Sequence, residues 1–319
     1  MALMAAFRLD GSGAAQALDL GDGLPEGPGL VWLHFARPTP AEQDWLSDAA
    51  LDPVVLEALD AAETRPRCTV HGDGVLMNMR GVNLSEGAQP EDMVSLRLWV
   101  TGGLVISVQR RPVQAVRDVI TACERGAGPV DAGDLVARLA LRLADRAEPV
   151  VAELNERIDD LEERFEASDH IRLRAQVGEI RRVSIILRRF MFPLRDALST
   201  FGIEDMGWLT SNARSRVREA TERVTRLAED LDSIRDRAEV VHDQMLELRA
   251  EVANRQMLVL SVVTAIFLPL GLVTGLLGIN VGGIPGAQDP WAFWQVCALL
   301  LAIVAVQVVL FRRLGLLRK

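Results

Sequence analysis

Histidine, cysteine and tyrosine are scarce in this chain of 319 residues, which has four, three and none of them. Cys68, Cys123 and Cys297 are too few and too scattered for a disulfide framework, so the sequence fits a reducing compartment. Basic residues are also fewer than acidic ones: the chain has 35 Lys and Arg and 44 Asp and Glu, which gives a net charge of −9. Binding to phosphates needs a positive surface, so we expect no nucleic acid partner and favour a cation.

Signatures of common enzyme classes are missing too. The sequence contains no Walker-type Gly-rich loop, no Gly-x-Ser-x-Gly and no His-Glu-x-x-His. We therefore expect a protein that is not an enzyme and that has no cofactor. Residues 1–10 do not combine a basic region with a long apolar run, so we expect the N-terminal part to stay in the cytoplasm.

Charged side chains are absent from residues 256–288 and again from residues 290–311. The mean hydropathy is +0.16 although 25% of the residues are charged, so the apolar excess is concentrated in these stretches. A helix needs roughly 20 apolar residues to cross a bilayer, which residues 257–277 and 291–311 both provide. We predict transmembrane helices over 257–280 and 291–311, and we disfavour the alternative of buried helices in a soluble core.

Basic residues flank the two predicted spans on one side only. Arg249 and Arg255 precede the first span, a basic tail at 312–319 follows the second, and the loop at 281–290 has no Lys or Arg. The positive-inside rule predicts that both termini are cytoplasmic and that this loop is external. The loop has one carboxylate, Asp289, and Trp and Phe residues follow it, as is typical of an interface.

Residues 1–130 show short apolar alternations between turn signals. They predict strands at 6–9, 30–35, 75–79, 95–100 and 104–108. Helices are expected at 40–50, 53–62 and 113–124. This mixture indicates an α/β or α+β cytoplasmic domain.

Long helices are expected from residue 132 onward, and they carry a charge split. Residues 151–170 are rich in acidic side chains, whereas residues 171–195 are rich in arginine and have Glu179 as their only acid. An acidic arm followed by a basic arm predicts a helical hairpin over 131–207 that turns near 167–170, or pairing with a neighbouring subunit. We favour a solvated structural hairpin, because exposed ion pairs contribute little.

Glycine and proline are absent between Leu209 and Pro269. Over this stretch apolar residues recur at alternating spacings of three and four, which is an a/d heptad pattern. They are Val217, Ala220, Val224, Leu227, Leu231, Ile234, Ala238, Val241, Met245, Leu248 and Val252. We predict a coiled-coil stalk helix over 208–256 that continues into the first span.

A stripe of carboxylates lies opposite this apolar seam, at spacings of four, three and four that place it on one helix face. It consists of Asp232, Asp236, Glu239 and Asp243. Continued into the span, the same face reaches Met257, Ser261, Thr264, Leu268 and Gly271. If several subunits surround an axis, this face would line a cation path. A solvated outer face of a coiled coil accounts for the stripe equally well.

The first span ends in Gly278, Ile279 and Asn280, and at this point the chain resembles the CorA superfamily of divalent-metal transporters. That family combines a cytoplasmic α/β funnel domain, a long stalk helix, two C-terminal spans and a Gly-Met-Asn signature. Here isoleucine replaces methionine. Residues 274–286 and 64–68 are similar to the ZntB branch, whose members are zinc transporters. The resemblance covers the whole chain.

The resemblance implies a homopentamer in the bacterial inner membrane that transports divalent cations, with Zn²⁺ as the expected ion. Asn280 of each subunit would offer oxygens to a hydrated cation at the pore mouth, and Gly278 would let the chain turn. A helix C-cap is the alternative role for this motif. The alternative functions are a Mg²⁺ or Co²⁺ channel and a membrane-anchored scaffold without transport. The spans lack carboxyl, histidine and basic groups, so proton coupling would need Asp289, cytoplasmic carboxylates or water.

Two short motifs have a spacing that suits zinc ligands. Cys68-x-x-His71 has no second pair nearby, and an ordinary surface pair is its simpler interpretation. Glu239-x-x-His242 places two ligands one helical turn apart in the acidic stripe. Within the spans only Cys297 is a zinc-type ligand, so we expect a passing zinc ion to stay hydrated or weakly held by oxygens.

Overall fold

A computed structural model describes residues 3–19, 27–36, 45, 51–62, 65–167, 170–279, 281–282, 284, 286 and 288–314. The chain forms two compact units, Met1–His242 and Asp243–Lys319. They are taken in turn below.

A seven-stranded sheet forms the centre of the first unit, with the order β2-β1-β3-β7-β6-β5-β4. Its strands are β1 (Leu3–Leu9), β2 (Ala15–Ala17), β3 (Leu30–Ala36), β4 (Arg67–His71), β5 (Gly74–Gly81), β6 (Val94–Val100) and β7 (Leu104–Gln109). Among the described strands, β3 and β7 pair in parallel and the other neighbours are antiparallel. The five predicted strands are present, whereas the short strands β2 and β4 were not predicted.

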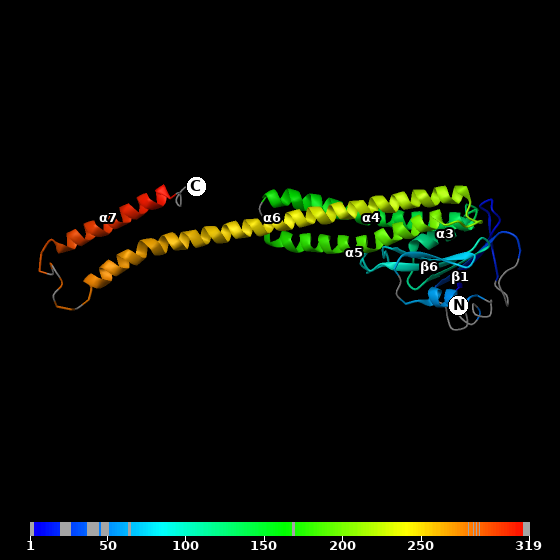
Figure 1. Ribbon diagram of the computed structural model, residues 1–319, viewed down its shortest axis with the longest axis horizontal. Coiled ribbons are helices and arrows are strands. Elements are labelled where there is room, and N and C mark those ends of the chain that lie inside the picture. Colours follow the sequence, from blue (N-terminus) through cyan, green and yellow to red (C-terminus); the bar gives the residue numbers. More distant parts are fainter. Residues whose placement is uncertain are drawn as a thin grey trace. The chain divides into compact units, whose positions relative to one another are not determined.

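Helices cover both faces of the sheet, which explains why β3 and β7 are apolar almost throughout. On one face α2 (Pro53–Asp60) packs Val55 and Leu59 against Phe35 and Val108. Figure 1 shows this short blue helix on the side of the sheet opposite the long helices. The helix expected at 40–50 lies outside the described residues, apart from Trp45.

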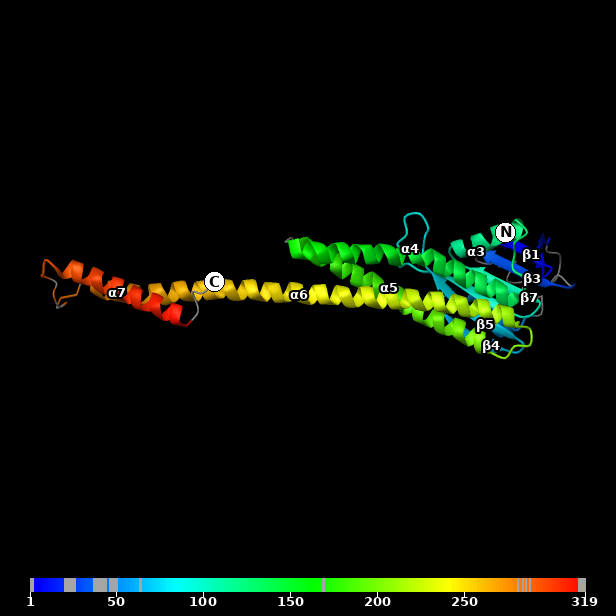
Figure 2. The same ribbon diagram turned by 90° about the horizontal axis from the view of Figure 1, so that it is seen from above.

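The other described helices are α3 (Gln114–Glu124), α4 (Ala132–Ala167), α5 (His170–Ile203), α6 (Ser211–Leu277) and α7 (Ala292–Arg313). In Figures 1 and 2, α4, α5 and the first part of α6 run side by side. The heptad residues of α6 from Val217 to Met245 are buried. Leu248 is half-buried and Val252 is 55% exposed. The seam therefore serves as core for one chain, in contact with its own helices.

The expected start of the long helix at Trp208 is wrong by three residues. The indole Nε1 of Trp208 donates to the carbonyl oxygen of Asp73 at 3.0 Å, and its ring lies against Gly102. A Cβ at Gly102 would come within 2.8 Å of the Trp208 Cβ, so this contact needs glycine. Thr210 then caps the helix that begins at Ser211.

The second unit consists of the end of α6, the segment at 278–291 and α7. None of the described residues in 246–314 is buried. Both α6 and α7 contain a stretch that is long and apolar enough to cross a membrane. The predicted architecture of an α/β domain, a long helix and two apolar C-terminal helices is confirmed.

Candidate functional site

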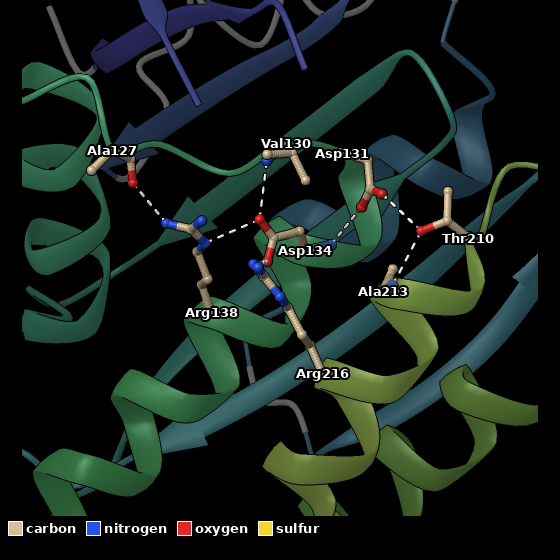
Figure 3. Close-up of polar contacts among 8 residues, drawn as sticks. All are labelled: Ala127, Val130, Asp131, Asp134, Arg138, Thr210, Ala213 and Arg216. Carbon is tan, nitrogen blue, oxygen red and sulfur yellow. Dashed lines mark hydrogen bonds and ion pairs between the residues drawn. The ribbon is translucent and has the colours of Figure 1, made fainter. Parts of the chain in front are cut away.

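The N-termini of α4 and α6 are joined by their capping side chains (Figure 3). Asp131 accepts the backbone N–H of Asp134 at 2.7 Å, and Thr210 accepts the N–H of Ala213 at 3.1 Å. The hydroxyl of Thr210 also donates to the second carboxylate oxygen of Asp131 at 2.9 Å. Each cap satisfies a backbone donor that a helix N-terminus leaves free. The start of the long helix α6 is thereby tied to α4.

Asp134 strengthens this junction from within the core, since its side chain is 1% exposed. Its carboxylate accepts the N–H of Val130 at 3.0 Å and Nε of Arg138 at 3.0 Å. Arg216 of α6 pairs with the other oxygen, as Figure 3 shows. A buried carboxylate with two arginines and a backbone donor is compensated for its lost hydration.

The acidic arm on α4 binds an arginine of α6. Arg237 donates through Nε to Glu162 at 2.9 Å and through Nη1 to Asn155 at 3.1 Å, and it also pairs with Asp159. The hydrogen bonds that Arg237 donates to Glu162 and Asp159 raise the pKa of Arg237. The carboxylates of α4 are therefore partly neutralised by α6.

The basic arm on α5 binds the carboxylate stripe on α6. Arg188 pairs with Asp232, and Arg181 lies 3.3 Å from Glu239. Asp236 pairs with its neighbour Arg235, whereas no ion pair of Asp243 is found among the described side chains. Three of the four stripe residues thus have arginine partners within the chain.

The two arms therefore meet mainly through α6 and seldom directly. One described ion pair joins α4 and α5, between Arg157 and Glu179 at 3.4 Å. Glu179 is the single acid of the basic arm. The sequence predicts complementary arms or pairing with a partner subunit, and it does not reveal that a third helix, α6, makes ion pairs with both arms.

The structure does not bring Cys68 and His71 together. They lie three residues apart on β4, so their side chains point to opposite faces of the sheet. His71 Nε2 lies 2.8 Å from Asp52, whereas burial raises the pKa of the Cys68 thiol to about 12. Cys68 and His71 therefore do not form the candidate zinc pair. A Cys-x-x-His spacing brings two ligands together on a turn or helix, but on a strand it places them on opposite faces.

Glu239 and His242 share a face of α6, but Glu239 is bound to Arg181. Among the described residues, no group of three or more His, Cys, Asp or Glu side chains is placed to hold a metal ion. Glu239-x-x-His242 stays a prediction with two ligands, which is fewer than a tight zinc site uses.

Within the second unit, Met257, Ser261, Thr264, Leu268 and Gly271 are all exposed on α6. Ser261 Oγ donates to the carbonyl oxygen of Met257 at 2.8 Å, and Thr264 Oγ1 donates to that of Leu260 at 2.8 Å. The hydroxyl hydrogens are satisfied by the helix itself. Their oxygen lone pairs face outward and can accept a hydrogen bond from a hydrated ion.

The end of the first span is described as far as Ile279, and Asn280 lies outside the described residues. Gly278 donates its N–H to Thr274 at 3.0 Å, and a Cβ there would lie 3.1 Å from the same carbonyl oxygen. Gly278 is absent from the positive-φ glycines, so a left-handed C-cap does not form at that residue. Ile279 is exposed, and Asp289 accepts the N–H of Trp291 at 2.9 Å before α7 begins.

Comparisons with known proteins agree with this architecture. A family model described as "CorA-like Mg2+ transporter protein" matches residues 27–313. The "Zinc transport protein ZntB" of Pectobacterium carotovorum is 36% identical over 301 residues, which are 94% of this chain and 91% of that protein. The "Divalent cation transporter CmaX" of Pseudomonas aeruginosa is 39% identical over 287 residues, covering 89% and 86%.

A solved structure, "structure of the full-length CmaX protein", is also similar. It has a TM-score of 0.80 and 38% sequence identity, and it covers 98% of each chain. The relatives are transporters and not enzymes, in keeping with the missing catalytic signatures. The sheet domain, the long helix, the two apolar C-terminal helices and these matches together show that the chain belongs to the CorA family of divalent-cation transporters.

Proposed function

We propose that the chain assembles as a homopentamer in the bacterial inner membrane and transports Zn²⁺ along an axis lined by α6. The lining face consists of Met257, Ser261, Thr264, Leu268 and Gly271. A single pair of apolar helices cannot enclose a hydrophilic path, so several copies must surround it. The zinc relative supports the choice of ion, and the CorA family supports assembly from identical subunits.

The observation that carries the proposal is the exposure of this face of α6. The half-buried residues of the same stretch of α6 lie on the opposite side of the helix from the lining face. They are Val262, Ile266, Pro269, Leu270 and Val273. The lining face is thus the more exposed side of this stretch of α6, and it stays free for an axis. At Gly271 a Cβ would meet nothing within 4 Å, so this face is open.

The chemistry of the lining face suits a hydrated cation. It offers hydroxyl oxygens and a thioether, with no carboxylate or histidine to bind zinc tightly. Weak binding lets an ion leave as well as enter. Asn280 from each subunit then forms the pore mouth with Gly278 and Ile279, and Asp243, the stripe residue with no ion pair among the described side chains, attracts cations at the cytoplasmic end.

Both termini are placed in the cytoplasm in this proposal, because arginines flank the spans and the loop has none. Proton coupling, where it occurs, uses Asp289 or the cytoplasmic carboxylates, since the spans have no such groups.

Purified protein in vesicles that contain a zinc-sensitive dye tests the proposal. We expect zinc influx that falls by at least tenfold in Asn280→Ala, while Gln295→Met on α7 keeps the rate. Mg²⁺ is added as competitor, because the family model is described for magnesium. Strong inhibition by equimolar Mg²⁺ would favour a magnesium channel, and the absence of any ion flux would favour a scaffold.

A further inference from the structure

One polar side chain crosses between the two apolar helices of the second unit. Gln307 of α7 donates through Nε2 to the backbone carbonyl oxygen of Ala265 in α6, at 2.8 Å. Both residues lie in the charge-free stretches, where water is not available to replace such a bond. This contact therefore joins the spans at a point where a polar group is costly.

The carbonyl of Ala265 needs a donor from outside its own helix. In an α-helix this carbonyl accepts the N–H of the residue four positions later, which is Pro269. Proline has no N–H, and its ring pushes the same carbonyl away from the helix axis. The acceptor that Gln307 reaches is thus the one that Pro269 leaves free.

The neighbouring hydroxyls do not serve this carbonyl. Thr264 donates to Leu260 at 2.8 Å, and Thr274 donates to Leu270 at 2.9 Å and Gly271 at 3.3 Å. Gln307 Oε1 has no hydrogen-bond partner among the described residues. The bond from Nε2 to Ala265 is therefore the hydrogen bond that the Gln307 amide makes within the described structure. Since a carbonyl only accepts, the nitrogen of the amide must face it.

We propose that Gln307 is a positioning residue for transport: its amide replaces the N–H that Pro269 lacks and holds α7 on α6 at this break. The inference rests on the proposed function where transport is concerned. Pro269 and Ala265 lie beside the lining residues Leu268 and Thr264, so the bond fixes the course of α6 toward Gly278. Pro269 and Gln307 therefore act as a pair.

A double-mutant cycle on the full-length protein tests the pairing of Pro269 with Gln307. Gln307→Met keeps the length of the side chain and removes the donor, whereas Pro269→Ala restores the missing N–H. In detergent we expect Gln307→Met to lower Tm by roughly 2–4 °C. The same substitution in the Pro269→Ala background is expected to cause no further loss. Gln295→Met, an exposed glutamine of the same helix, serves as the matched control.

Zinc flux into vesicles is measured on the four proteins of the cycle: the unmodified chain, Gln307→Met, Pro269→Ala and the double variant. We expect Gln307→Met to slow flux several-fold relative to the unmodified chain, and to leave the rate of Pro269→Ala unchanged. If the unmodified chain carries no zinc, the proposed function fails while the Tm cycle still decides the pairing. Equal losses of Tm from Gln307→Met in both backgrounds would overturn the inference.

Failure of Gln307→Met to assemble is also informative. Assembly of Pro269→Ala/Gln307→Met would then support the pairing, since the restored N–H makes the amide dispensable. If the double variant fails while Pro269→Ala assembles, the pairing is wrong. Pro269→Leu, which also restores the N–H, replaces Pro269→Ala in the cycle where the alanine variant does not assemble.

Discussion

The two units of the chain differ in where they place their large apolar side chains. In Met1–His242, Trp32, Phe35 and Phe201 are fully buried. In Asp243–Lys319, Leu268 is 71% exposed and Leu301 is 72% exposed. The first unit encloses its own core, whereas the second presents its apolar side chains outward.

Polar groups follow the same division. The charges of the first unit pair across α4, α5 and α6, as Arg237 and Arg188 show. In the second unit the hydroxyls of Ser261 and Thr264 bond to their own helix. A solvent without hydrogen bonds requires such local satisfaction. The difference indicates that the first unit forms a core from its own side chains, whereas the second unit contains two apolar helices of membrane-spanning length with exposed side chains.

The largest effect is expected where the first unit buries a charge. Asp134→Asn removes the negative charge between Arg138 and Arg216, and we expect a loss of about 3 kcal/mol of unfolding free energy. This corresponds to a fall in Tm of roughly 6–12 °C, measured by thermal unfolding of the full chain. Asp236→Asn is the matched control, because its carboxylate is 60% exposed and pairs with a neighbouring residue. Similar Tm values for the two variants would contradict a self-contained core.

A second prediction tests the core of the first unit by pH. Burial lowers the pKa of His34 to about 4, from an ordinary value near 6.5. Between these values the unfolded chain binds a proton that the folded chain does not. The unfolding free energy therefore falls as the pH drops from about 6.5 to about 4, by up to roughly 3 kcal/mol. His34→Gln is expected to flatten the dependence of Tm on pH over that window, and a parallel curve would show that other groups carry it.

A third prediction asks what covers the second unit. Leu268→Cys and Leu301→Cys are matched, since these leucines are 71% and 72% exposed. If an aqueous axis faces α6, a water-soluble thiol reagent should label position 268 at least tenfold faster than position 301 in vesicles. Cys297 is first replaced by serine. Burial raises the pKa of Cys68 to about 12 and that of Cys123 to about 11, so these thiols react slowly. Equal rates would mean that lipid covers both faces.

Local periodicity explains how much of this fold the sequence predicted. The five main strands, the long helices and both apolar C-terminal helices follow from apolar spacing, although the described helix α6 ends at Leu277 and the first span was predicted to reach residue 280. The start at Ser211 was missed because Trp208 packs on Gly102, which lies far away in sequence. Cys68-x-x-His71 failed for a related reason, since its short edge strand β4 was not recognised.

The candidate site was predictable only where it depends on one helix. The lining face at 257–271 lies on one side of a single helix, and its residues are exposed in the described structure. Contacts between elements were not predictable, and they include Asp134 with Arg216 and Gln307 with Ala265. A signal was available for the second of these, because a glutamine in an apolar span and a proline in the other span each call for a partner.

The smallest expected effect distinguishes a network of charges from an isolated pair within the first unit. Arg237 binds Asn155, Asp159 and Glu162 together, whereas Arg181 lies 3.3 Å from Glu239 alone. We expect Arg237→Gln to cost about 1 kcal/mol and Arg181→Gln less than about 0.5 kcal/mol, as measured by Tm of the full chain. Raising the salt from 0.1 M to 1 M shortens the Debye length from about 10 Å to about 3 Å, so the difference should shrink. A difference that salt leaves unchanged would instead assign the loss to packing of the Arg237 stem between α4 and α6.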